Sequence, residues 1–131
     1  MNKQTIPAVL ILAVSLMVII GSQTFLAPCI HEDGTFGPCH WAGQMLLGLG
    51  CALGVLAVLA FCMPRARMGI YLGILPVCVL GILTPGTLID LCRMSTMRCR
   101  MVMQPAAVIL SAACFVCAVF GAALSAGRGK R

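Results

Sequence analysis

Four long apolar runs restrict this sequence to a narrow set of folds. The runs cover residues 6–27, 41–63, 69–91 and 105–126, and no run carries a charged residue before its final turn. Each run supplies the roughly 20 apolar residues that a helix needs to cross a bilayer. Backbone groups in lipid must bond within the chain, and the runs show no alternation of apolar and polar residues. We therefore predict helices and not strands.

Composition leads to the same class of protein. The 131 residues are 61% hydrophobic and only 9% charged, whereas about 25% of the residues of a soluble domain are charged. The connections between the runs are short, so successive helices should be antiparallel neighbours. We predict an all-α integral membrane protein, an up-down four-helix bundle in which residues 1–131 form one domain.

The basic residues are unevenly divided between the two sides that this topology defines. One side holds Lys3, Arg65, Arg67, Arg128, Lys130 and Arg131. The other side holds Arg93, Arg98 and Arg100 together with all the acids, Glu32, Asp33 and Asp90. Because Lys and Arg favour the cytoplasmic side, we predict an inner-membrane protein with both termini in the cytoplasm. The basic residues after the last run are then topology signals, and no nucleic-acid binding is expected.

Four of the nine cysteines lie in the two polar interruptions that this topology places on the outer side. They are Cys29 and Cys39 in the first interruption and Cys92 and Cys99 in the second. Cell exteriors and the bacterial periplasm are oxidising, so cysteines there tend to pair. Four cysteines allow three connectivities, and pairing within each loop or across the two loops stays open. The first hypothesis is a disulfide-capped outer face.

A second hypothesis is thiol–disulfide exchange at the same cysteines. Four-helix membrane oxidoreductases that make disulfides with a quinone carry cysteine pairs in outer loops, and this topology is similar to theirs. Such enzymes use a Cys-x-x-Cys pair, because close spacing lets the second thiol attack a mixed disulfide. Neither outer pair has that spacing here, which favours a structural role.

A third hypothesis is soft-metal or haem binding at the outer face. Its candidate ligands are Cys39, His40, Cys92, Met97 and Cys99. Thiolate and thioether sulfur favour Cu(I), and mixtures of cysteine and histidine favour zinc. Methionine is also a common filler of apolar helices. No cofactor is therefore the first expectation, and copper, zinc or haem is the alternative.

The apolar runs themselves offer little for chemistry. Three acids and two histidines leave no catalytic constellation, so we predict no catalytic residue and no enzyme activity. A second set of cysteines falls near the middle of the runs: Cys51, Cys78, Cys114 and Cys117. Unpaired cysteine packs as a small hydrophobe, and the lack of an intramembrane acid argues against a transporter that acts alone.

Small residues and prolines should shape the helices. The segments Gly50–Gly54 and Gly69–Gly73 both have the GxxxG spacing that lets helix backbones approach closely in lipid. We expect both motifs to pack within the bundle. Pro76 and Pro85 should kink the third helix, and residues 84–87 should disturb its outer end.

Two segments beside the polar interruptions carry a family resemblance. One is Gly37-Pro38-Cys39-His40-Trp41-Ala42-Gly43-Gln44, and the other contains Leu88-Ile89-Asp90-Leu91-Cys92, Met97-Arg98-Cys99-Arg100 and Gln104-Pro105-Ala106. Together they resemble an uncharacterised family of small four-helix membrane proteins of bacteria and archaea, known only as a domain of unknown function. The resemblance implies the four-helix fold, the outer cysteines and company with ABC-type export systems.

These observations lead to one functional expectation. Trp41 and Arg100 flank the apolar runs and are expected to anchor them at the membrane interface. Little of the chain is left to act in water. We therefore expect a non-enzymatic accessory subunit, packed in the lipid bilayer against a larger membrane complex such as a transporter.

Overall fold

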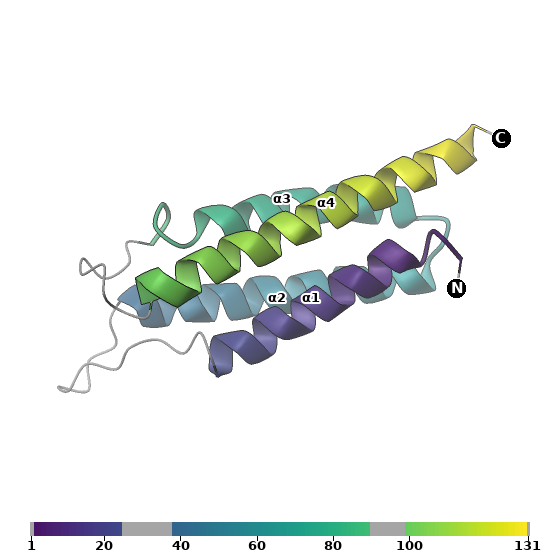
Figure 1. Cartoon of the computed structure of the whole chain (residues 1–131). Helices are drawn as coiled ribbons and strands as arrows, with labels where there is room; N and C mark the ends of the chain where they lie inside the picture. The colour runs from purple at the N-terminus through teal and green to yellow at the C-terminus, as the bar shows by residue number, and fades with distance from the viewer. Residues whose placement is uncertain (1, 25–37, 90–98, 131) are drawn as a thin grey trace.

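The computed structural model describes residues 2–24, 38–89 and 99–130, without the side chains of residues 38, 39, 99 and 100. This part of the chain forms four α-helices: α1 (Ile6–Gln23), α2 (Pro38–Cys62), α3 (Arg67–Leu83) and α4 (Gln104–Gly129). A π-helical turn, Cys99–Met103, leads into α4. The helices run alternately up and down, and α1 begins at the end of the bundle where α4 finishes (Figure 1). An all-α membrane bundle is confirmed for the described residues.

The two ends of the bundle differ in composition. We call one the basic end: α1 begins there, α4 finishes there, and α2 connects to α3. It carries Lys3, Arg65, Arg67, Arg128 and Lys130. We call the other the loop end, where α1 and α3 finish and α2 and α4 begin. The described ranges contain no Asp or Glu, so the charges described at the basic end are all positive.

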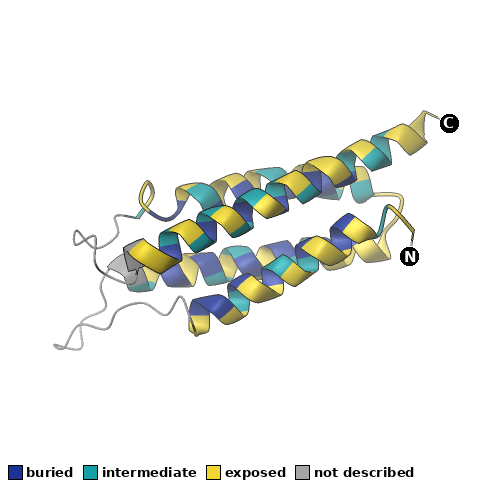
Figure 2. Ribbon diagram, in the orientation of Figure 1, coloured by how far each residue is buried: buried dark blue, intermediate teal, exposed yellow. Residues whose placement is uncertain are grey.

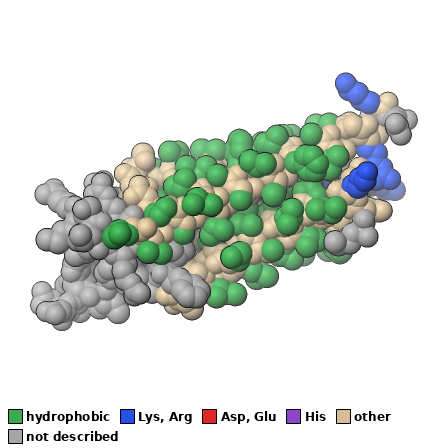
Figure 3. Space-filling view, in the orientation of Figure 1, with side chains coloured by type: hydrophobic (Ala, Val, Ile, Leu, Met, Phe, Trp, Pro, Cys, Tyr) green, Lys and Arg blue, Asp and Glu red, His purple; other side chains and the backbone are tan. Residues whose placement is uncertain are grey.

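The outer surface of the helices is apolar. Three stretches are long and apolar enough to cross a membrane, namely Ile6–Gln23, His40–Cys62 and Met101–Gly129. Figures 2 and 3 show exposed positions along every helix and hydrophobic side chains over the middle of the bundle. The large exposed side chains include Leu16, Ile20, Val55, Phe61, Ile109, Val116 and Phe120. A continuous apolar surface of this extent needs lipid and not water around it, so this is a membrane protein.

The third helix is shorter than the sequence suggests. We expected it to reach residue 91, but α3 ends at Leu83 after 17 residues. Pro85 has no N–H to continue the helix, and Gly86 adopts a φ of +95°, a conformation that glycine accepts most easily. The Leu88 and Ile89 amides donate back to the Leu83 and Thr84 carbonyls. The disturbance expected at residues 84–87 is therefore a compact turn that closes α3.

Glycine brings α1 and α2 together. A Cβ added at Gly50 would lie 3.1 Å from Cγ1 of Ile19, and one added at Gly54 would lie 3.3 Å from Oγ of Ser15. The Ser15 hydroxyl donates to the Leu12 carbonyl of its own helix at 2.7 Å. The Gly50–Gly54 motif therefore packs within the bundle, as expected.

The second GxxxG motif behaves differently. Gly69 and Gly73 are exposed, and a Cβ added at either would meet nothing within 4 Å. The expectation that this motif packs inside the bundle is wrong for the described residues. Spacing alone does not say which face of a helix points inward, because in lipid both faces are apolar.

Candidate functional site

The four cysteines of the predicted outer face lie largely beyond what the structure describes. Cys29, Cys92 and Met97 fall outside the described residues, and Cys39, Cys99 and Arg100 are described in backbone only. α2 begins at Pro38 and the π-helical turn begins at Cys99, so Cys39 and Cys99 both stand at helix starts. The disulfide cap and the outer metal site remain predictions.

The loop end does show what brings these two helix starts together. Ala42 and Leu46 of α2 pack with Met103 and Ala107, and each is at most 2% exposed. Ile89, in the turn after α3, packs against the same cluster. Cys39 lies one turn before Ala42, and Cys99 lies one turn before Met103. The backbones of Cys39 and Cys99 therefore come to the same end of the bundle.

His40 and Trp41 lie beside this cluster at the start of α2. Their ring centroids are 5.7 Å apart with an interplanar angle of 80°, an edge-to-face contact. Trp41 is 63% exposed, whereas the next residue, Ala42, is buried. An indole that points away from the bundle at a helix start suits the interfacial position expected for Trp41.

The basic end is held by hydrogen bonds between distant parts of the chain. A guanidinium N–H of Arg128 donates to the side-chain carbonyl oxygen of Gln4 at 2.7 Å. The Tyr71 hydroxyl donates to the backbone carbonyl of Gln4 at 3.4 Å, and Arg67 Nε donates to the Ala60 carbonyl at 2.8 Å. Gln4 therefore links the start of α1 to both α3 and α4.

A close antiparallel seam joins α3 to α4. Tyr71, the largest fully buried side chain described, lies against Gly121, where an added Cβ would be 2.7 Å from the ring. Cys78 and Cys114 are both fully buried in the same core cluster and occupy matching positions on the two helices. Gly81 lies against Ser111, whose Oγ would be 2.5 Å from an added Cβ. We call these three pairs the α3–α4 seam.

The pairs of the seam follow one register. Along α3, Cys78 follows Tyr71 by seven residues and Gly81 follows Cys78 by three. Along α4, Cys114 precedes Gly121 by seven residues and Ser111 precedes Cys114 by three. Each step returns to the same helix face. A glycine lies at two of the three positions, opposite Tyr71 and opposite Ser111, so the two backbones can lie close together.

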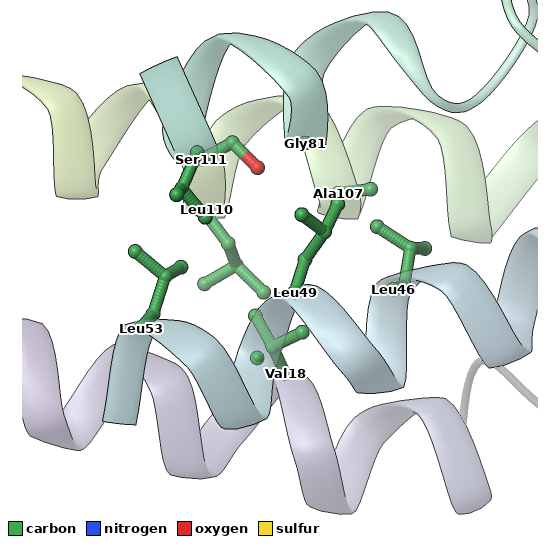
Figure 4. Close-up of a pocket in the computed structure, with 10 residues that line it drawn as sticks. Val18, Leu46, Leu49, Leu53, Gly81, Ala107, Leu110 and Ser111 are labelled. Carbon is green, nitrogen blue, oxygen red and sulfur yellow. The ribbon is translucent and has the colours of Figure 1, made fainter. Parts of the chain in front are cut away.

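A small cavity lies where all four helices meet, next to the seam (Figure 4). Its volume is about 10 Å³, room for about one water molecule. The lining is apolar except for one hydroxyl, and it includes Val18, Leu46, Leu53, Gly81, Leu110 and Ser111. A solute larger than water does not fit in this cavity as the helices are packed here.

The cysteines expected to pack inside the helices fall into two groups. Cys78 and Cys114 are fully buried, Cys117 is half-buried, and Cys51 and Cys62 are exposed on the apolar surface. These cysteines thus behave as small apolar side chains in two settings, inside the bundle and on its lipid-facing surface. Among the side chains that the structure describes, no group of three His, Cys, Asp or Glu could hold a metal ion.

Comparison with known proteins gives a family and no activity. The family model described as a domain of unknown function, DUF4418, matches residues 10–124. The chain belongs to the DUF4418 family. The match covers all four helices in whole or in large part, in agreement with the uncharacterised family that the sequence resembles. No curated protein and no solved structure matches this DUF4418 chain.

Two features of this DUF4418 protein were not predicted from its sequence. One is the Tyr71–Gly121 contact, although a lone tyrosine in an apolar helix and a glycine inside another helix are both visible in the sequence. The other is the link from Gln4 to Arg128, two residues 124 positions apart. Neither pair has a spacing that identifies it before the helices are placed together.

Proposed function

We propose that this DUF4418 protein is a non-enzymatic accessory subunit of a larger complex in the inner membrane. The observation that carries the proposal is the contrast between surface and interior. The interior beside the seam has a cavity of about 10 Å³, too small for a transported solute. The surface, in contrast, is broad, apolar and exposed. The described bundle is therefore better suited to bind other membrane components than to hold a solute.

The proposed orientation follows from the basic end. Five Lys and Arg residues lie there, and the described ranges hold no acid to balance them. Positive residues favour the cytoplasmic side, which puts both termini in the cytoplasm and the loop end outside. Cys29, Cys39, Cys92 and Cys99 would then meet an oxidising compartment, which supports a disulfide cap.

The identity of the partner is a further step of the same proposal. The resemblance noted above suggests an ABC-type export system. The described helices can contribute to such a complex by packing against the helices of other subunits. In lipid that packing depends on close backbone approach at small residues, and α3 presents Gly69 and Gly73 with nothing within 4 Å of an added Cβ.

The test is the mass of the particle that carries this chain. The protein is extracted from its native membrane in a mild detergent, and the particle is compared with the 13.7 kDa of the chain. We expect a larger particle that contains at least one other polypeptide. Recovery of the free monomer alone would contradict the proposal.

Matched variants locate the contact surface. Gly69→Leu with Gly73→Leu adds bulk where no neighbour stands, so the chain should still fold and the larger particle should be lost. Gly127→Leu adds the same bulk at another open position of the basic end, and the larger particle should survive. If the Gly69/Gly73 double variant keeps the full particle, the contact lies on another face.

Two other functions rest on the same outer cysteines. A metal or haem protein should retain an ion or chromophore after purification and lose it in Cys92→Ser or Cys99→Ser. A thiol–disulfide oxidoreductase should show outer thiols that cycle between reduced and oxidised forms. A protein free of metal with permanently oxidised outer cysteines would exclude both functions.

A further inference from the structure

Two basic side chains at the basic end are exposed and have no partner in the part of the chain that the structure describes. Lys3 lies just before α1, and Arg65 lies in the connection from α2 to α3. Neither side chain makes a hydrogen bond or an ion pair to a described residue. Arg67 and Arg128 differ, because each donates a hydrogen bond within the bundle. The charges of Lys3 and Arg65 are thus available to a ligand from outside the chain.

An apolar groove lies between α1 and α2 on the side of the basic end. Its volume is about 170 Å³. The first two turns of α1 and the last two turns of α2 line it, through Ala8, Val9, Leu12, Ala57, Val58 and Phe61. Val9, Val58 and Phe61 are exposed on the surface of the bundle. The groove therefore opens toward the surrounding lipid.

The register of α1 and α2 brings the two charges to the mouth of this groove. Gly54 of α2 lies against Ser15 of α1. Because the helices are antiparallel, seven residues farther along α2 and seven back along α1 the register pairs Phe61 with Ala8, and both line the groove. The two exposed basic residues lie four or five residues beyond this pair. Figure 3 shows the basic side chains at this end, beyond the hydrophobic side chains of the middle of the bundle.

We propose that the groove binds one anionic phospholipid, with an acyl chain between α1 and α2 and the phosphate beside Arg65 and Lys3. An arginine guanidinium matches phosphate oxygens in geometry as well as in charge, and basic pockets between membrane helices suit anionic headgroups. Long basic side chains can reach the headgroups while their stems stay on apolar surface. A zwitterionic lipid fits less well, because the described ranges contain no Asp or Glu to pair with its cationic group.

A site of this kind differs from the general attraction of basic residues to an anionic membrane surface. General attraction depends on the number of charges near the surface, so Lys130 should contribute to it as much as Arg65 does. Lys130 is exposed after α4 at the same end of the bundle, whereas the described lining of the groove comes from α1 and α2. Only a site in the groove requires Arg65 to matter more than Lys130. The inference does not depend on the accessory role, because it concerns the isolated chain.

The test counts the lipids that stay bound to the full chain by native mass spectrometry from detergent micelles. The micelles contain equal amounts of phosphatidylglycerol and phosphatidylcholine with the same acyl chains, and the lipid concentration is raised stepwise. We expect one phosphatidylglycerol to be retained in preference to phosphatidylcholine. Arg65→Gln should weaken its binding about fivefold, the effect of one charge, and Arg65→Gln with Lys3→Gln roughly 25-fold. Lys130→Gln removes the same charge from the same end and should leave the affinity for the first lipid unchanged.

Two further comparisons separate a lipid from a free phosphate and the groove from the rest of the apolar surface. Val58→Phe fills the groove and should lower the binding of phosphatidylglycerol, whereas Val79→Phe adds the same bulk at an exposed position of α3 and should not. Glycerol phosphate has the phosphate but no acyl chain, and it should not displace the lipid. Circular dichroism checks the fold of each variant, and Arg65→Ala and Val9→Phe replace any groove variant that does not fold.

Several results would overturn the proposal. Equal retention of the two lipids would remove the preference for an anionic headgroup. Equal losses in Arg65→Gln and Lys130→Gln would show general attraction, and equal effects of Val58→Phe and Val79→Phe would exclude the groove. Displacement of the lipid by glycerol phosphate at the same concentration would show a phosphate site that does not use the groove.

Discussion

Replacement of Gly121 by alanine tests the contact between α4 and Tyr71, the largest fully buried side chain described. The added Cβ would lie 2.7 Å from Cζ and 2.9 Å from Cε1 and Cε2 of Tyr71. The ring is fully buried, and its hydroxyl donates a hydrogen bond to the backbone carbonyl of Gln4, just before α1. The ring therefore has little room to move away. We expect α3 and α4 to separate locally and the bundle to lose stability.

The size of the loss follows from two opposed effects. Overpacking a close-packed core costs about 1–3 kcal/mol, whereas alanine in place of glycine inside a helix gains about 1 kcal/mol. Gly127→Ala, on the same helix with nothing within 4 Å of the added Cβ, carries only the gain. The difference between Gly121→Ala and Gly127→Ala should therefore be about 1–3 kcal/mol.

Reversible unfolding in mixed detergent micelles measures this difference. Helical circular dichroism follows the unfolding, and each variant is compared at the same detergent ratio. Tyr71→Leu combined with Gly121→Ala should recover part of the loss, because the smaller side chain removes the clash, and contacting residues couple by about 0.5–3 kcal/mol. Equal stability of Gly121→Ala and Gly127→Ala would refute the close contact at the seam.

Three further predictions concern the turn, the basic end and the orientation. Gly86→Ala should lower the free energy of unfolding by about 1–3 kcal/mol, since Gly86 has a φ of +95°. Gly48→Ala, at an open position, should cause no such loss. Equal losses for the two variants in the same unfolding assay would contradict the turn conformation described for Gly86. Gln4→Ala should lower it by about 0.5–1.5 kcal/mol, and adding Arg128→Ala should then cost nothing more, which a double-mutant cycle measures; fully additive losses would mean that the two side chains do not interact. Lys130→Cys should react with a membrane-impermeant maleimide in inverted vesicles and not in intact cells, and the reverse pattern would contradict a cytoplasmic C-terminus.

The presence of the helices could be predicted because lipid imposes two simple requirements. Each apolar run must satisfy its own backbone and must be long enough to cross. The end of α3 was harder to place, because apolar residues continue to Leu91 while Pro85 and Gly86 already close the helix. In that segment the backbone conformation of two residues outweighs hydropathy.

Burial could not be predicted in the same way. In a soluble helix the apolar face points inward, but in lipid both faces are apolar and hydropathy loses this information. Gly50 packs against α1 while Gly69 and Gly73 face outward, and Cys78 is buried while Cys51 is exposed. Only the placement of neighbouring helices separates these positions, and the predicted outer cysteines lie mostly outside the described residues.

The central claim is that the outer cysteines form permanent disulfides, and one measurement tests it directly. Free thiols are alkylated in intact cells, and the protein is then digested without reduction and mapped by mass spectrometry. Cys29, Cys39, Cys92 and Cys99 should all appear in two disulfides, and the pattern should not change with growth under reducing or oxidising conditions. Free outer thiols, or disulfides that come and go with those conditions, would contradict a non-enzymatic, disulfide-capped subunit.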